Sequence, residues 1–154
     1  MGYEIAGALG AKMAAPDREV FALVGDGSYV MLHSEIITSI MEGLKINVLV
    51  FDNHGFQCID NLQVSQGITK YGNEWRRRDR KTGRLTGDVV PIDFARNGES
   101  YGARGFTVRR IEELRDAVRQ RVRRQQRRHR GHCLLAGWQD IGFRVNVECN
   151  GRPG

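Results

Sequence analysis

The chain has 154 residues, of which 40% are hydrophobic and 27% are charged, so its length and composition are those of one ordinary globular domain. It contains no apolar stretch long enough to span a membrane and no basic, apolar start of the secretory type, which predicts a cytoplasmic protein. The net charge is +6, and residues 119–154 carry the excess, with 9 of the 24 Lys and Arg residues but only 2 of the 18 Asp and Glu residues.

The first fifteen residues are predicted to form a helix that is rich in small side chains. Ile5, Leu9 and Met13 recur every four residues, and glycines at positions 7 and 10 permit close packing on a sheet. The pair Pro16-Asp17 is expected to end this helix.

Residues 20–51 have the pattern strand, helix, strand. Two short apolar runs, Val20–Val24 and Ile46–Phe51, are typical of buried strands. The segment between them has apolar residues at helical spacing, namely Met31, Leu32, Ile36, Ile37, Ile40, Met41 and Leu44. A crossover of this length returns the second strand parallel to the first, so we predict an α/β fold with a doubly wound parallel sheet.

Polar groups follow both predicted strands: Gly25-Asp26-Gly27-Ser28 after the first, and Asp52-Asn53-His54-Gly55 after the second. Ligands of parallel α/β sheets bind just outside the carboxyl ends of the strands. Glycine lets backbone N–H groups approach an anion, and a helix that begins at Ser28 favours a phosphate. An acid beside a phosphate requires a cation, and the oxygens of Asp26, of Asn53 and of the Gly55 carbonyl suit Mg²⁺. The alternative is a doubly wound fold of other function, with Asp26 as a helix N-cap.

The Gly-Asp-Gly sequence, the 27-residue step from Asp26 to Asn53 and the short glycine-containing loop resemble the cofactor motif of thiamine diphosphate enzymes. That motif usually ends in Asn-Asn, whereas this chain has Asp52-Asn53 and keeps the second Asn, the family's ligand. The resemblance implies that Asp26, Asn53 and the Gly55 carbonyl hold Mg²⁺, which holds the diphosphate of the cofactor. Because Met1-Gly2-Tyr3 resembles the segment before the first helix in this family, Met1 would match the residue that wedges under the cofactor.

Residues 56–93 are predicted to be a long loop region with at most short helices, and such loops are usually functional or mobile. We expect Cys58 to be a small buried residue near the site rather than a nucleophile, and Trp75-Arg76-Arg77-Arg78 to belong to a solvated charged loop rather than to an anion site. The run FDNHGFQCIDNLQ, the later NEWR and the IDFA run resemble one branch of the family, the trihydroxycyclohexane-1,2-dione acylhydrolases of myo-inositol catabolism. Acetolactate synthase-like lyases are the neighbouring alternative.

Residues 92–108 are predicted to form a helix, with Phe94 and Tyr101 on one face, followed by a strand at Phe106-Thr107-Val108. A second helix is predicted over Arg110–Val122. These elements also resemble the end of the thiamine diphosphate domain.

The resemblance stops near residue 119, and we therefore divide the chain into a partial cofactor-binding domain, residues 1–118, and a basic tail, residues 119–154. The short apolar runs Leu134–Ala136 and Phe143–Val147 have no clear position in the predicted sheet. Our hypothesis is a change of reading frame near residue 119, which would disrupt the fold from there on. A nucleic-acid-binding arm is the less favoured alternative, because the tail lacks interleaved aromatic residues.

The resemblance implies a thiamine diphosphate-dependent hydrolase that opens a cyclic 1,2-dione by cleaving a C–C bond, and a homo-oligomer for the complete enzyme. In this family a glutamate from another domain activates the cofactor. Glu4, Glu35 and Glu42 lie on predicted helices of the diphosphate-binding domain, so no catalytic residue is assigned. We expect a chain that begins inside a domain, that lacks its leading strand and that is inactive alone. A non-catalytic phosphate-binding α/β module is the alternative of a different class.

Overall fold

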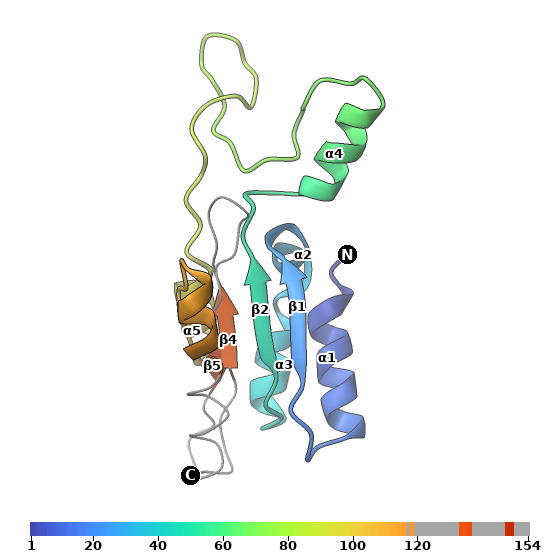
Figure 1. The fold of residues 1–154 in the computed structure, drawn as a ribbon, viewed down its shortest axis with the longest axis vertical. Coiled ribbons are helices and arrows are strands. Elements are labelled where there is room, and N and C mark those ends of the chain that lie inside the picture. Colours follow the sequence, from blue (N-terminus) through green and yellow to red (C-terminus); the bar gives the residue numbers. More distant parts are fainter. Residues whose placement is uncertain (117, 119–132, 137–146, 150–154) are drawn as a thin grey trace.

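The protein is an α/β structure, seen in a computed structural model that describes residues 1–116, 118, 133–136 and 147–149 (Figure 1). The described strands form one five-stranded sheet in the order β1-β2-β4-β5-β3. The strands are β1 (Phe21–Gly25), β2 (Asn47–Phe51), β3 (Ala103–Arg104), β4 (Cys133–Ala136) and β5 (Val147–Cys149). The helices are α1 (Tyr3–Ala14), α2 (Asp26–Leu32), α3 (Glu35–Met41), α4 (Gln57–Ser65) and α5 (Phe94–Ser100).

The predicted parallel pairing of the first two strands is confirmed. Strand β1 pairs with β2 in parallel, in a register that places Phe21 opposite Asn47 and Gly25 opposite Phe51. The remaining pairings make the sheet mixed, because β4 is parallel to β2 while β5 is antiparallel to both β4 and β3.

The prediction that Leu134–Ala136 has no position in the sheet was wrong. These residues belong to β4, whose Leu134 pairs with Val48 of the neighbouring β2. A four-residue apolar run is enough for a strand when it can pair with the edge of a neighbouring strand. The prediction failed because the basic sequence before this run does not resemble a buried element. Of the predicted tail, the structure describes only residues 133–136 and 147–149, so most of Phe143–Val147 lies outside the described residues.

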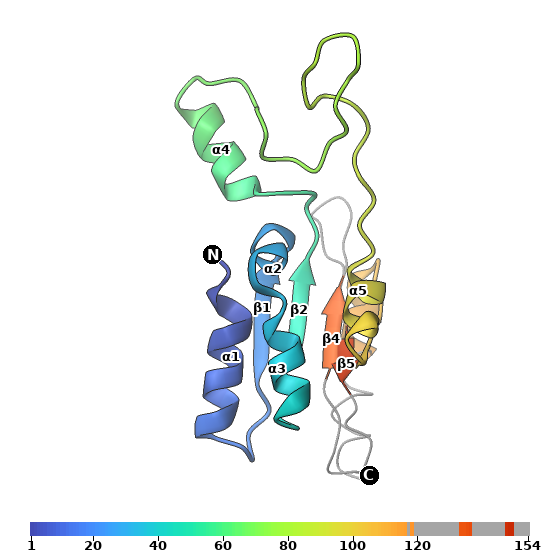
Figure 2. The same ribbon diagram turned by 180° about the vertical axis from the view of Figure 1, so that it is seen from behind.

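One face of the sheet carries the main hydrophobic core. Alternate residues of β1 and β2 point to this face, and helices α1, α2, α3 and α5 cover it, with α3 and α5 in front of the strands in Figure 2. Its members are Ile5, Ala8, Ala22, Val24, Tyr29, Ile36, Ile46, Val48, Val50, Phe94 and Ala103. Tyr29 and Phe94 are its largest fully buried side chains and meet edge to face, with ring centroids 5.4 Å apart.

The opposite face is covered in part by residues 106–116 and 118, of which residues 111–116 are helical. Val108 is buried there against Leu49, Phe106, Leu114 and Val118. Helices therefore lie on both faces, as predicted for a doubly wound sheet. The prediction of a strand at Phe106–Val108 was wrong, because the strand of this region is β3, which begins three residues earlier, at Ala103.

The single helix predicted between the first two strands is instead two short helices, α2 and α3, separated by His33 and Ser34. Both intervening residues keep right-handed helical dihedral angles, so the apolar spacing continues across the break. The predicted apolar face is only partly buried: Ile36 is fully buried, whereas Met31 and Met41 are 52% and 79% exposed.

Beyond the carboxyl ends of β1 and β2, residues 57–90 extend away from the sheet and contain helix α4 and a long loop (Figure 1). We call residues 57–90 the projecting segment and the rest of the described structure the sheet body. The prediction of a loop region with only short helices is confirmed. Cys58 is exposed, so its predicted burial was wrong, because α4 leaves the sheet body at that point. No helix within the described residues is long and apolar enough to cross a membrane.

Candidate functional site

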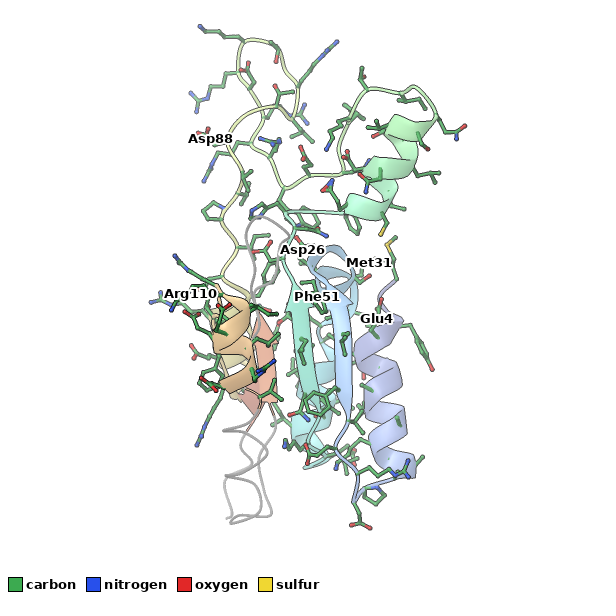
Figure 3. The ribbon with its side chains drawn as sticks, in the orientation of Figure 1. Glu4, Asp26, Met31, Phe51, Asp88 and Arg110 are labelled. Carbon is green, nitrogen blue, oxygen red and sulfur yellow. The ribbon has the colours of Figure 1, made fainter. Side chains whose placement is uncertain are left out.

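Two buried carboxylates follow the carboxyl ends of β1 and β2. The last residues of these strands, Gly25 and Phe51, are paired across the sheet, so the residues that follow them are neighbours. Those residues are Asp26, which is 0% exposed, and Asp52, which is 2% exposed. The sequence-based expectation that this edge gathers polar groups is met, and Figure 3 shows Asp26 at this edge, where the projecting segment leaves the sheet body.

Three N–H groups hold the Asp26 carboxylate in place. Its Oδ2 accepts hydrogen bonds from the backbone N–H of Gly55 at 2.8 Å and from Nε1–H of Trp75 at 2.9 Å. Its Oδ1 accepts a hydrogen bond from the backbone N–H of Gly27 at 3.0 Å. The alternative of Asp26 as a helix N-cap was wrong, since Gly25 occupies that position and Asp26 is the first residue of α2.

Burial raises the pKa of the Asp26 carboxyl from its ordinary value of 3.8 to about 6. The negative charge of Asp52 raises the pKa as well, while the hydrogen bonds from Trp75, Gly55 and Gly27 lower it. The protein thus places an acid where its charged form lacks solvation. A cation at this point would favour the charged form and reverse the shift.

Glycine is required at two positions around this carboxylate. A Cβ on Gly55, whose φ is +148°, would lie 2.0 Å from the carbonyl oxygen of Asn73, and a Cβ on Gly27 would lie 2.6 Å from the ring of Phe56. These close approaches bring the loop after β2 and the projecting segment onto Asp26, so the two predicted glycines shape the site through packing as well as through backbone exposure.

The other predicted site residues are distributed around this centre. Ser28 is buried in the first turn of α2, and Gly25 ends β1 with no atom near the position of a Cβ. Asn53 follows Asp52 with an exposed side chain. Met1 is 65% exposed, and the N-terminus lies at the same edge of the sheet as α2 (Figure 1).

His54 forms the rim of the site. Its Nδ1 lies 3.1 Å from Oδ1 of Asp52, and its backbone N–H donates to the same oxygen at 3.2 Å. Its φ of +66° is the only positive value of a non-glycine residue in the described chain. That backbone conformation turns the chain sharply enough for Gly55 to reach Asp26.

Sequence reasoning missed Trp75, which was assigned to a solvated charged loop. It follows Asp26 by 49 residues, and its ring also meets that of Phe56 edge to face, with centroids 5.1 Å apart. The only available signal was a single tryptophan within an otherwise charged run, because tryptophan rarely stays in water without a packing or hydrogen-bonding partner.

The predicted donor set is of a kind that hard cations accept. Within the described residues no group of three or more His, Cys, Asp and Glu side chains could hold a metal ion. The predicted set instead combines a carboxylate, an amide oxygen and a backbone carbonyl oxygen, which are ligands that Mg²⁺ and Ca²⁺ accept and soft metals do not.

The sequence is similar to a known protein family and to named relatives. Residues 1–135 match the family described as thiamine pyrophosphate enzyme, C-terminal TPP binding domain. Over 118 residues the chain is 53% identical to a 3D-(3,5/4)-trihydroxycyclohexane-1,2-dione hydrolase of Geobacillus thermodenitrificans and 54% identical to one of Clostridium botulinum. These matches cover 77% of this chain but only 18% of each relative, so the chain spans about a fifth of their length.

Among solved structures, the chain resembles a thiamine diphosphate-dependent 4-hydroxybenzoylformate decarboxylase of Rhodococcus jostii. The TM-score is 0.63 at 23% identity, over 80% of this chain and 21% of the other. At that identity the likeness concerns the fold alone, and it agrees with the α/β architecture predicted from the sequence.

Proposed function

The chain belongs to the thiamine pyrophosphate enzymes, whose C-terminal TPP binding domain it matches over residues 1–135, and from that premise we propose that Asp26, Asn53 and the Gly55 carbonyl hold the Mg²⁺ of a thiamine diphosphate site. Gly25, Gly27 and Ser28 would hold the diphosphate, and Met1 would lie under the cofactor. The observation that supports this proposal is the buried Asp26 carboxylate, which follows β1 and accepts a hydrogen bond from Gly55 of the loop after the parallel strand β2.

The residues present fit a magnesium ion. Burial, and after it the negative charge of Asp52, raise the pKa of the Asp26 carboxyl, and a divalent cation would favour the charged form of this carboxylate. The hydrogen bonds from Gly27, Gly55 and Trp75 fix the orientation of the Asp26 carboxylate, which is the role of outer-shell donors around metal ligands.

The residues also fit a diphosphate. Gly25 has no atom within 4 Å of the position of a Cβ, and Ser28 adds a hydroxyl in a buried position, whereas the N–H of Gly27 already donates to Oδ1 of Asp26. Through the metal, Asp26 would act on the diphosphate without touching it, which explains an acid beside an anionic group.

For the complete enzyme we propose the hydrolytic opening of a cyclic 1,2-dione by C–C cleavage, in the inositol-catabolic branch of the family. The identity of 53–54% to relatives named 3D-(3,5/4)-trihydroxycyclohexane-1,2-dione hydrolases supports this branch over an acetolactate synthase-like lyase. When bound, thiamine diphosphate supplies a carbon nucleophile and an electron sink for carbonyl substrates. The part played by this chain is to bind and orient the cofactor, and the complete enzyme is proposed to be a homo-oligomer.

The binding proposal is tested by thermal unfolding of the chain with Mg²⁺ plus thiamine diphosphate, and separately with Mg²⁺ plus ADP. A ligand at 100 times its Kd stabilises the folded state by about 2.7 kcal/mol, so we expect a clear rise in Tm with thiamine diphosphate and a smaller one with ADP. Equal shifts would favour the alternative of a general phosphate-binding module.

A matched pair of variants locates the site. Asn53→Ala should abolish the shift given by thiamine diphosphate, because it removes a proposed metal ligand, whereas Asn61→Ala, at an exposed position of α4, should leave it unchanged. An undiminished shift in Asn53→Ala would remove Asn53 from the site.

An activity assay tests the proposal that this chain binds the cofactor but does not catalyse the reaction by itself. We expect the 154-residue chain alone to show no ring opening of a cyclic 1,2-dione, because no acid of α1, α2 or α3 is proposed to activate the cofactor. Measured ring opening by this chain would overturn that assignment.

A further inference from the structure

Asp52 is a second acid buried at the candidate site, and the proposed set of metal ligands gives it no role. It is 2% exposed and follows β2, just as the fully buried Asp26 follows β1. Two acids buried at one edge of a sheet are unfavourable unless each makes compensating contacts. The contacts of Asp52 therefore indicate what this side chain does.

Two contacts of Asp52 are made to the residue two positions further along the chain. Its Oδ1 accepts a hydrogen bond from the backbone N–H of His54 at 3.2 Å and lies 3.1 Å from Nδ1 of the same residue. An aspartate oxygen that binds the backbone N–H two residues later stabilises a tight turn. Asp52 thus holds both the backbone and the side chain of His54.

His54 has a backbone conformation that depends on such contacts. Its φ of +66° lies in the left-handed region, and among the described residues no other side-chain-bearing residue has a positive φ. That region is unfavourable for a residue with a Cβ, whereas glycine adopts it without strain. The strain at His54 is therefore offset by its surroundings, and Asp52 provides two of the contacts that do so.

The turn at His54 connects three parts of the candidate site. Its carbonyl oxygen accepts a hydrogen bond from the N–H of Trp75 at 2.8 Å, and the next residue, Gly55, donates its N–H to Oδ2 of Asp26 at 2.8 Å. The two proposed ligands from this loop, Asn53 and the Gly55 carbonyl, lie on either side of His54 in the chain. The dihedral angles of His54 therefore set how these two ligands are oriented relative to each other.

We propose that Asp52 is a positioning residue of the metal site, which holds His54 in its left-handed conformation. That conformation presents Asn53 and Gly55 to the cation, so Asp52 acts through the turn rather than as a metal ligand. This inference rests on the proposed function for the identity of the cation and the cofactor, and on the contacts of the turn for the role of Asp52.

The first test is the affinity for Mg²⁺, measured by isothermal titration of the 154-residue chain in the presence of saturating thiamine diphosphate. Asp52→Ala should weaken Mg²⁺ binding by about tenfold or more, the usual effect of removing an outer-shell residue. Asp52→Asn should lose less, because it keeps an oxygen that accepts the N–H of His54. Asp88→Asn, at an exposed position on the projecting segment (Figure 3), should bind Mg²⁺ as the unaltered chain does.

A double variant separates positioning from a direct effect of the Asp52 charge. Adding His54→Gly to Asp52→Ala should recover most of the lost Mg²⁺ affinity, because glycine adopts a positive φ without the support of Asp52. Neither a metal ligand nor a charge that attracts the cation directly would be replaced in this way. Equal losses in Asp52→Asn and Asp52→Ala, or no recovery in the double variant, would overturn the proposal.

A further comparison covers the case in which Asp52→Ala fails to fold. His54→Gly alone and the double variant should then bind Mg²⁺ with nearly the same affinity, because Asp52 has no strained turn to support once position 54 is glycine. A tenfold difference between these two proteins would contradict the role assigned to Asp52.

A measurement without metal or cofactor distinguishes this inference from the proposed function. Exchange of the Gly55 amide hydrogen, followed by nuclear magnetic resonance, reports on the hydrogen bond from Gly55 to Asp26. Exchange should accelerate about tenfold or more in Asp52→Ala and return toward the original rate in the double variant, and unchanged exchange in Asp52→Ala would overturn the positioning role. Failure of the proposed function would instead leave this exchange pattern intact, while the unaltered chain would bind no Mg²⁺ in the presence of thiamine diphosphate.

Discussion

The sheet body and the projecting segment are stabilised in opposite ways. The body buries apolar side chains, such as Tyr29, Phe94 and Ile36, between the sheet and its helices. In residues 57–90 the only buried residue is a carboxylate, Asp60. The segment is connected to the body by backbone pairs and by Trp75, rather than by a core of its own.

The two regions therefore contribute differently to the site around Asp26: the body positions residues through its strands, and the projecting segment adds polar contacts. Strand register in the body fixes Asp26 and Asp52, and this arrangement is as stable as the fold. The projecting segment adds polar contacts at the low end of local stability, which is where binding segments are generally found. Substitutions in the buried core of the body should therefore lower global stability most, and substitutions in the projecting segment away from its contact with Asp26 should change stability little.

The largest effect is expected in the core of the body. Phe94→Ala should lower the free energy of unfolding by about 3–5 kcal/mol, because Phe94 is 1% exposed and its removal leaves a cavity beside Tyr29. Phe21→Ala, at a site 39% exposed on the other face, should cost about 1 kcal/mol or less. Urea unfolding followed by circular dichroism measures both, and equal losses would contradict the contrast between buried core and open surface.

The pH dependence of stability probes the junction of the two regions. Between pH 3.8 and about 6 the folded chain binds more protons at Asp26 than the unfolded chain does, since its pKa is raised on folding. The stabilisation is complete below pH 3.8 and is lost as the pH rises through about 6, so at pH 7 this group alone costs about 3 kcal/mol.

Asp26→Asn should remove this part of the pH dependence, and so should saturating Mg²⁺ with thiamine diphosphate, because a cation favours the charged carboxylate. Asp88→Asn, exposed on the projecting segment, should keep it. The comparison is made by urea unfolding of each protein from pH 4 to pH 8. If Asp26→Asn kept the full slope, another group would be responsible.

The next largest effect is expected from loss of the hydrogen bond between Trp75 and Asp26. Trp75→Phe keeps an aromatic ring against Phe56 but removes the N–H donor to Asp26, so we expect a loss of about 2 kcal/mol at pH 7 and a further rise in the pKa of Asp26. Tyr71→Phe, at a position 68% exposed in the same segment, should change stability by less than about 0.5 kcal/mol. Hydrogen exchange of residues 57–90 should accelerate in Trp75→Phe, and unchanged exchange would show that other contacts hold the segment.

The sheet body could largely be predicted from the sequence. Short apolar runs located β1 and β2 to within a residue, and the rule that parallel strands end at one edge brought Asp26 next to the residues after β2. Periodicity did not reveal the break between α2 and α3, because His33 and Ser34 keep helical dihedral angles. Nor could it show that Met41 would stay 79% exposed, since that depends on what packs against the helix.

The projecting segment could not be predicted in the same way. Its contacts, such as Trp75 with Asp26, Glu74 with Gly55 and Lys70 with Asp60, join residues far apart in the sequence through single polar interactions. Such contacts leave no periodic pattern. The exposure of Cys58, predicted as buried, has the same origin, because α4 lacks a sheet face on which to pack.

The smallest effect is expected in α4, which has no sheet face on which to pack. Leu62→Ala in α4 should change the free energy of unfolding by less than about 0.5 kcal/mol, because Leu62 is 60% exposed. Leu9→Ala in α1, at a residue only 4% exposed, should cost about 2–5 kcal/mol. A loss above about 1.5 kcal/mol in Leu62→Ala that grows with protein concentration would mean that α4 packs against a second copy of the chain. The projecting segment would then lack a hydrophobic core only in the single chain. In an assembly, the apolar side chains of α4 would be buried between two copies.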